Sequence, residues 1–136
     1  MKVMAIDHGP VRSGVAVSDP TGTLARPLRV IERIDAPGGQ RLLMRMIAEE
    51  TPERIVVGDP RLLSGRAGAQ ASVAAAFAER LREDVAVPVE LVDERLTTAE
   101  ATRRRAEAGG PRRGGPGIDS LAACVMLEAY LRGTRA

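Results

Sequence analysis

The residues of this sequence that are suited to chemistry are carboxylates at the ends of apolar runs. They are Asp7, Asp59, Asp93, Glu94 and Asp119. The first four follow short runs typical of buried strands, and the last stands at the start of a helical pattern. If the strands are parallel neighbours, their acids gather at one edge of a sheet, and such crowding is unfavourable unless a cation lies among them. Oxygen ligands favour Mg²⁺ or Mn²⁺, and two such ions can support cleavage of a phosphodiester bond.

Each acid also has a simpler interpretation. A lone Asp after a strand is usually a helix cap or a solvated turn residue. Asp59 precedes Pro60, and its role could be simply to shape a loop. Asp93 could pair with Arg95. Asp119 would be favoured at a helix start by the helix dipole alone. The metal site is therefore predicted from the shared position of the acids and not from any one of them.

His8 and Cys124 are the only histidine and the only cysteine of the chain. They are too few for a disulfide within the chain or for a zinc site made of Cys and His. His8 is more typical of a loop residue than of a general base, and Cys124 is typical of a small core residue. Catalysis by this chain would depend on carboxylates.

Hydrophobic periodicity predicts the elements that carry these acids. Short apolar or alternating runs indicate strands, and apolar residues at helical spacing indicate helices. The predicted strands cover residues 3–6, 14–17, 27–31, 54–58 and 88–92, and the predicted helices contain residues 42–47, 73–81, 97–107 and 118–129. Pro37-Gly38-Gly39 predicts a break before the first helix, and residues 60–68 and 109–117 predict loops. On the last helix the predicted apolar face consists of Ile118, Leu121, Ala122, Val125 and Ala129.

This order predicts an α/β fold with a five-stranded mixed sheet and helices on both faces. Strands joined by helical crossovers should be parallel, and strands joined by tight turns should be antiparallel. Numbered along the chain, the strands should lie in the order 3-2-1-4-5, within one domain that spans residues 1–136. Ligands of such sheets bind at the carboxyl ends of the strands, here beside the first strand.

Composition agrees with one compact domain, since 44% of the 136 residues are hydrophobic and 28% are charged. Of the 20 basic residues only Lys2 is a lysine. Arginine binds phosphate better than lysine does, because its planar guanidinium can donate two hydrogen bonds at once. The net charge of +2 therefore permits a nucleic-acid partner. With Phe77 and Tyr130 as the only aromatic residues, a base-stacking platform is not expected. Apolar runs are short and the first residues show no signal pattern, so we expect a cytoplasmic protein without a membrane partner.

Four segments resemble, in order and spacing, the motifs of the YqgF family, which comprises Holliday junction resolvase-like proteins and nucleases implicated in processing the precursor of small-subunit ribosomal RNA. Asp7–Ala16 resembles its D-x-G-x-x-R-x-G-V-A motif, and Ile55–Pro60 resembles its V-V-G-L-P segment. Asp93–Thr98 matches D-E-R-L-T-T, and Asp119–Ala123 matches D-x-x-A-A. The resemblance implies a ribonuclease H-like fold.

The same resemblance implies roles for individual residues. Asp7, Glu94 and Asp119 would be the catalytic acids that bind Mg²⁺ or Mn²⁺, and Arg12 and Arg95 would lie near the scissile phosphate. Asp59 stands where the family usually has Leu, so it is either an added ligand or a tolerated exposed residue, and Asp93 is a further possible ligand.

Four more arginines are candidates for binding a phosphate backbone. Arg112 and Arg113 lie in the Gly/Pro loop before Asp119, where they would suit a phosphate clamp, although an exposed loop of no special role is the alternative. Arg61 and Arg66 make a weaker case for the same role.

We therefore expect a metal-dependent endonuclease, a hydrolase acting on ester bonds in structured nucleic acid. Processing of the 5′ end of pre-16S rRNA is favoured over cleavage of branched DNA, because the resemblance leans that way. The alternatives are a Holliday junction resolvase and a non-catalytic ribosome or RNA-binding factor on the same fold. An ATP-binding domain of the actin and sugar-kinase type would need a second domain to enclose the nucleotide. The sequence leaves open whether the chain acts as a monomer or a homodimer.

Overall fold

The structure, a computed structural model, describes residues 1–59, 69–93 and 118–135, with the backbone alone for a few residues at the ends of these ranges. Its elements are β1 (Val3–Asp7), β2 (Arg12–Ser18), β3 (Ala25–Glu32), α1 (Pro37–Glu50), β4 (Arg54–Asp59), α3 (Ala69–Asp84), β5 (Val89–Asp93) and α5 (Ile118–Arg135). The helix predicted for residues 97–107 and the loops predicted for residues 60–68 and 109–117 lie outside the described residues. Every other predicted strand and helix is present.

The strands form one five-stranded sheet in the order β3-β2-β1-β4-β5, which confirms the predicted order. β1 is parallel to β4, and β4 is parallel to β5, because helical crossovers return the chain to the same edge. β1 and β2 are antiparallel, as are β2 and β3, because tight turns join them. The central strand β1 therefore separates the hairpin half of the sheet from the crossover half.

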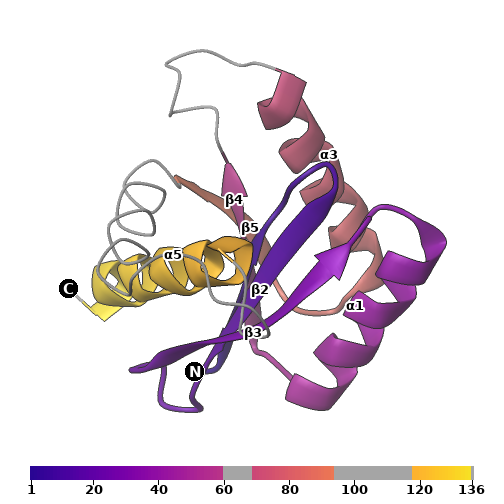
Figure 1. The fold of residues 1–136 in the computed structure, drawn as a ribbon. Coiled ribbons are helices and arrows are strands. Elements are labelled where there is room, and N and C mark those ends of the chain that lie inside the picture. Colours follow the sequence, from indigo (N-terminus) through magenta and orange to yellow (C-terminus); the bar gives the residue numbers. More distant parts are fainter. Residues whose placement is uncertain (60–68, 94–117, 136) are drawn as a thin grey trace.

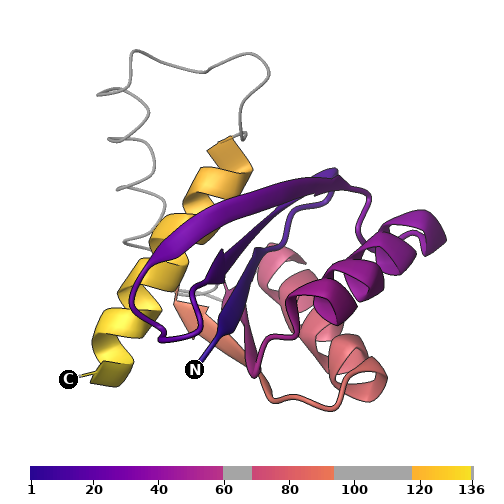
Figure 2. The same ribbon diagram turned by 90° about the horizontal axis from the view of Figure 1, so that it is seen from below.

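Helices cover both faces of the sheet (Figures 1 and 2). α5 lies against one face, whereas α1 and α3 lie together against the other. β1 is an uninterrupted apolar run because it is buried from both sides. Its side chains alternate, so that Val3 and Ala5 pack in the core under α5, and Met4 and Ile6 pack in the core under α1 and α3.

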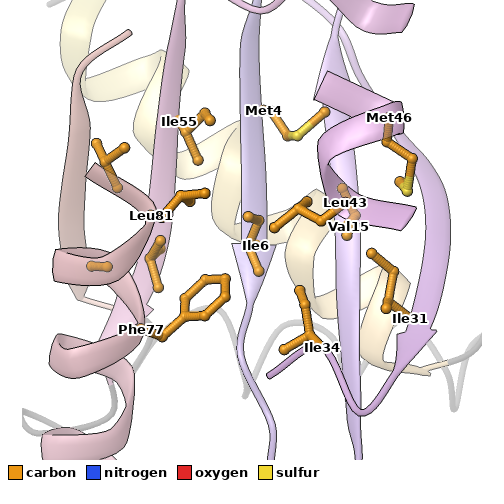
Figure 3. Packing of buried hydrophobic residues seen from close by; sticks show 13 residues of the cluster. Met4, Ile6, Val15, Ile31, Ile34, Leu43, Met46, Ile55, Phe77 and Leu81 are labelled. Atoms are coloured by element: carbon orange, nitrogen blue, oxygen red, sulfur yellow. The ribbon is translucent and has the colours of Figure 1, made fainter. Parts of the chain in front are cut away.

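The larger core lies on the α1 and α3 side (Figure 3). It joins the sheet to the two helices through residues that include Met4, Ile6, Val15, Ile31, Leu43, Met46, Ile55, Phe77 and Leu81. None of the helices that the structure describes combines the length and the apolar character that a membrane span requires.

The predicted break at Pro37-Gly38-Gly39 is wrong, because these residues form the first turn of α1. Proline is favoured at the first helical position, where its missing N–H would have no partner within the helix. Gly39 is required by a close approach: a Cβ there would stand 2.2 Å from the carbonyl oxygen of Arg33. Gly39 therefore allows the first turn of α1 to pack against the backbone of Arg33 and Ile34, in the turn that follows β3.

The buried face of α5 also differs from the predicted one. Val125 is buried as expected, but Ala129 is exposed and Leu121 is only half-buried. The core under α5 instead contains Ala123, Cys124, Met126, Leu127 and Leu131. Residues 121–127 are all apolar, so their spacing does not select one face of the helix. The burial of Cys124 confirms its prediction as a core residue.

Candidate active site

The three parallel strands end at one edge of the sheet, and each ends in an aspartate. β1 ends at Asp7, β4 at Asp59 and β5 at Asp93. The Cα atoms of Asp59 and Asp93 are partners in the parallel register of β4 and β5. On the other side of β4, Ile6 is the partner of Val57, so Asp7 lies one position beyond that pair. The backbone arrangement predicted for these three acids is thus present.

Asp7 is the acid whose side chain the structure describes. It is half-buried, and its backbone is paired with Gly14 of β2. Alternation along β1 puts Asp7 on the same face as Val3 and Ala5, which is the face covered by α5.

The start of α5 lies beside the end of β1. The hydroxyl of Ser120 is buried and donates a hydrogen bond of 3.4 Å to the backbone carbonyl of Val15. Val15 is in turn the register partner of Ile6, the residue before Asp7. Because Asp119 directly precedes Ser120, its backbone is brought to the same edge as Asp7. Ser120 was not singled out in the sequence, although its place in the D-x-x-A-A motif is a signal that could have drawn attention to it.

The turn between β1 and β2 is closed by Gly9 and Ser13. The N–H of Gly9 donates to Oγ of Ser13 at 3.1 Å, and this hydroxyl donates to the carbonyl of Gly9 at 3.4 Å. A Cβ at Gly9 would stand 2.2 Å from the carbonyl oxygen of Arg12, so only glycine fits this turn. The glycine of the D-x-G-x-x-R motif therefore allows the close return of the chain that puts exposed Arg12 near Asp7. Ser13 is a second residue that sequence reasoning missed.

His8 lies in the turn between β1 and β2, which confirms its prediction as a loop residue, and its side chain is buried there. Its Nε2–H donates to Oδ2 of Asp35 at 2.7 Å, and its ring centroid lies 4.7 Å from that of Phe77 in α3. Oδ1 of the same carboxylate accepts a hydrogen bond from Nη2 of Arg80, also in α3. His8 therefore faces the α3 side of the sheet, away from the face that carries Asp7, and a role as general base beside Asp7 is not supported. Neither Asp35 nor Arg80 has a local sequence signal, because each acts on residues distant in the chain.

A second polar cluster joins β4, β5 and α5 near the start of β4. Nη1 of Arg54 donates to Tyr130 at 3.0 Å and to Glu90 at 3.2 Å, and the hydroxyl of Tyr130 donates to Glu90. Burial raises the pKa of Tyr130, and its hydrogen bond to Glu90 raises it further. The hydrogen bond with Tyr130 raises the pKa of Arg54. This cluster ties α5 to the sheet away from the strand ends.

The remaining predicted site residues cannot be placed as side chains. Asp59, Asp93 and Asp119 are described by their backbone, whereas Glu94, Arg61, Arg66, Arg95, Arg112 and Arg113 lie outside the described residues. Among the side chains that the structure describes, no three from His, Cys, Asp and Glu are grouped as a metal site, and Asp7 is the only predicted ligand among those side chains.

Comparison with known proteins assigns the family. The sequence profile of RuvX, described as a Holliday junction resolvase, matches residues 1–133. The chain belongs to the RuvX family. RuvX and YqgF denote the same family, so the predicted family is confirmed.

Two bacterial relatives are similar over nearly the whole chain. The protein of Rhodococcus erythropolis is 43% identical over 135 residues, covering 94% of this chain and 76% of the relative. That of Streptomyces coelicolor is 40% identical over 134 residues, covering 97% and 80%. Both bear the name "Putative pre-16S rRNA nuclease".

Solved structures show that the RuvX chain has the ribonuclease H-like fold of RuvC-type resolvases, as predicted. RuvC of T. thermophilus in complex with a Holliday junction substrate matches with a TM-score of 0.58 at 18% identity, over 100% of this chain and 97% of that one. The resolvase of Fowlpox virus in complex with Holliday junction DNA matches with a TM-score of 0.62 at 11% identity, over 100% of both chains.

Proposed function

We propose that residues 1–136 form a single domain that acts as a metal-dependent nuclease and hydrolyses phosphodiester bonds in structured nucleic acid. The observation that carries this proposal is the common edge at which β1, β4 and β5 end in Asp7, Asp59 and Asp93. The start of α5 supports it, because the bond from Ser120 to Val15 brings the backbone of Asp119 to that edge.

The donors at this edge fit Mg²⁺ or Mn²⁺. They are carboxylates, which are the ligands that hard divalent ions prefer, and His8 is turned to the other face by its bond to Asp35. Neighbouring carboxylates at adjacent strand ends repel one another, and a cation relieves that repulsion. We assign Asp7, Glu94 and Asp119 as the ligands and treat Asp59 and Asp93 as additional candidates. When bound, the ions supply an activated water and charge stabilisation at the leaving oxygen.

The chain's own residues then have separate tasks. Asp7 sits on a strand that is paired on both sides, so its carboxylate has a rigid support. Arg12 stands at the start of β2, where the Gly9–Ser13 turn holds it next to that strand end and leaves it exposed for a phosphate oxygen. Arg95, Arg112, Arg113, Arg61 and Arg66 are proposed to bind further phosphates of the backbone.

The favoured substrate is the precursor of 16S rRNA, with its 5′ end as the site of cleavage. Relatives at about 40% identity over nearly the whole chain bear the name "Putative pre-16S rRNA nuclease", which supports the choice of RNA as the substrate. The junction resolvases of known structure are only 18% and 11% identical, and this likeness concerns the fold.

The test is a comparison of two substrates with the purified protein and added Mn²⁺. One is an RNA that spans the 5′ end of 16S rRNA with its precursor sequence, and the other is a four-way DNA junction. We expect cleavage of the RNA at one boundary, dependence on the ion, and no cleavage by Asp7→Asn. Preferred cleavage of the junction would instead make the protein a resolvase. Tight binding of the RNA without cleavage under any metal condition would contradict catalysis and support a non-catalytic RNA-binding factor.

A further inference from the structure

The carboxylate of Asp35 links His8, which follows the central strand β1, to the helix α3. Asp35 lies in the turn between β3 and α1, and its two oxygens are used by different partners. Oδ2 accepts from Nε2 of His8, and Oδ1 accepts from Nη2 of Arg80 in α3. The backbone carbonyl of Asp35 accepts a third bond, from the side chain of Gln40 at 3.0 Å. Asp35 therefore joins the residue that follows β1 to α1 and to α3.

The imidazole of His8 is buried, so its N–H depends on Asp35 as its hydrogen-bond acceptor. The side chain of His8 has 0% of its surface exposed, whereas those of Asp35 and Arg80 are 43% and 44% exposed. A buried N–H that loses its acceptor pays the full cost of desolvation, so the bond to Asp35 keeps His8 in this position. The ring of Phe77 packs against the imidazole and restricts it from the α3 side.

The position of His8 connects these contacts to the candidate active site. His8 directly follows Asp7, and the two residues lie on opposite faces of the sheet, so fixing His8 also fixes the strand end that carries Asp7. The turn containing Asp35 is itself held against the same loop, because the N–H of Arg33 donates to the carbonyl of Val11 at 2.8 Å. Arg33 adopts a left-handed backbone with φ of 49°, which a residue with a side chain keeps only where its surroundings enforce it.

We propose that His8, Asp35 and Arg80 form a positioning network for Asp7, and that this network sets the affinity of the candidate site for Mn²⁺. The inference rests on the proposed function, because it takes Asp7 as a metal ligand. Residues that orient a metal ligand without binding the metal are often important for the site. Replacing them commonly changes metal affinity or activity by about 10-fold to 100-fold. None of the three residues is expected to touch the metal or the substrate.

The test uses variants that separate the hydrogen bonds from the packing. His8→Phe keeps a ring against Phe77 but removes the donor to Asp35, and His8→Gln keeps an N–H near the position of Nε2. Arg80→Gln changes the exposed end of the network without altering the core. Glu79→Gln is the matched control, because Glu79 forms an exposed ion pair with Arg82 on the same helix and takes no part in the network.

The measurement is the dissociation constant of Mn²⁺ from the full chain, read from the electron paramagnetic resonance signal of free Mn²⁺ below the melting temperature of every variant. We expect His8→Phe to weaken binding about 10-fold, which is the lower end of the range for such groups, and His8→Gln to restore most of it. Arg80→Gln should weaken binding by a smaller factor than His8→Phe, because Arg80 is the exposed end of the network. Glu79→Gln should bind as the wild type does. The turnover number at saturating Mn²⁺ is measured in parallel.

The outcomes distinguish the network from the function on which it rests. A purely structural role would lower the melting temperature of His8→Phe and Arg80→Gln but leave Mn²⁺ affinity unchanged, and that result would overturn the proposal. Equal Mn²⁺ affinity in the wild type and in Asp7→Asn would contradict the proposed metal site itself. Weakened binding in the network variants, together with no cleavage by the wild type, would support the network and contradict the nuclease function.

Discussion

The Cα atoms of Asp59 and Asp93 are register partners at the ends of the parallel strands β4 and β5. Neighbouring strands lie about 4.8 Å apart, so two acidic residues meet at one edge of the sheet within a distance at which like charges repel. Only one of the two positions has an acid in the family motif that the sequence resembles, because Leu is usual where Asp59 stands. Asp59 is therefore the residue whose role is most open to test.

Asp59→Leu should cost little activity. The substitution removes one of two like charges at adjacent strand ends, so the folded protein without metal should be equally stable or slightly more stable. Mn²⁺-dependent cleavage and thermal melting measure the two effects. A loss of cleavage as large as that of Asp7→Asn would show instead that Asp59 is a metal ligand.

Asp7→Asn should abolish cleavage and leave the fold intact. The amide keeps the shape of the side chain but removes the negative charge that would hold the cations. Circular dichroism should match that of the wild type, and cleavage of the pre-16S rRNA segment should fall to background. Undiminished cleavage by this variant would remove Asp7 from the mechanism.

Replacing both Arg112 and Arg113 by Ala should weaken nucleic-acid binding about equally for all sequences. Each lost phosphate contact reduces the slope of log affinity against log salt by about one, so the slope should fall by about two at most. The cleavage sites should stay the same, because backbone contacts carry no sequence information. Binding titrations at several salt concentrations decide the matter, and an unchanged slope would leave the phosphate contacts to Arg12, Arg61, Arg66 and Arg95.

Gly39→Ala and Gly38→Ala form a matched pair at the start of α1. A Cβ at Gly39 would meet the backbone of Arg33 at 2.2 Å, and overpacking of this kind costs about 1–3 kcal/mol in the free energy of unfolding. At Gly38 the nearest atom is the side-chain Nη2 of Arg41 at 4.0 Å, so Ala there should stabilise by about 0.5–1 kcal/mol. Urea unfolding of both variants checks the opposite signs, and equal effects would contradict the close approach at Gly39.

Tyr130→Phe should lower the free energy of unfolding by about 1 kcal/mol at neutral pH, since it removes a hydroxyl bonded to both Glu90 and Arg54. Burial raises the pKa of Tyr130 in the folded state. Its stabilisation is therefore complete below the unfolded-state pKa of about 10 and is lost as the pH rises through the folded-state pKa. The wild type should lose stability faster than Tyr130→Phe above pH ~10, and parallel curves in that range would contradict the assignment.

The sequence predicts the parts of this molecule that depend on local pattern. Asp7 could be assigned to a strand end because four apolar residues precede it, and the strand order follows from the crossovers. Contacts between distant segments have no such pattern. The bond from His8 to Asp35 spans 27 residues, and that from Arg80 to Asp35 spans 45, so neither could be expected from the chain alone. The break predicted at Pro37-Gly38-Gly39 was wrong, because proline and glycine occur at helix starts as well as in turns.

β3 is a terminal strand of the sheet, and its residues limit what can be added to it. Its outer edge would offer backbone groups to another extended chain, which is the first step of edge-to-edge aggregation. Pro27 has no N–H to donate, and the register with β2 shifts between Val15 and Ala16, which interrupts a regular template. Exposed Arg26 and Arg29 add charge along the same strand. These features of β3 oppose the addition of another strand at this edge, whereas the acids lie at the carboxyl ends of β1, β4 and β5.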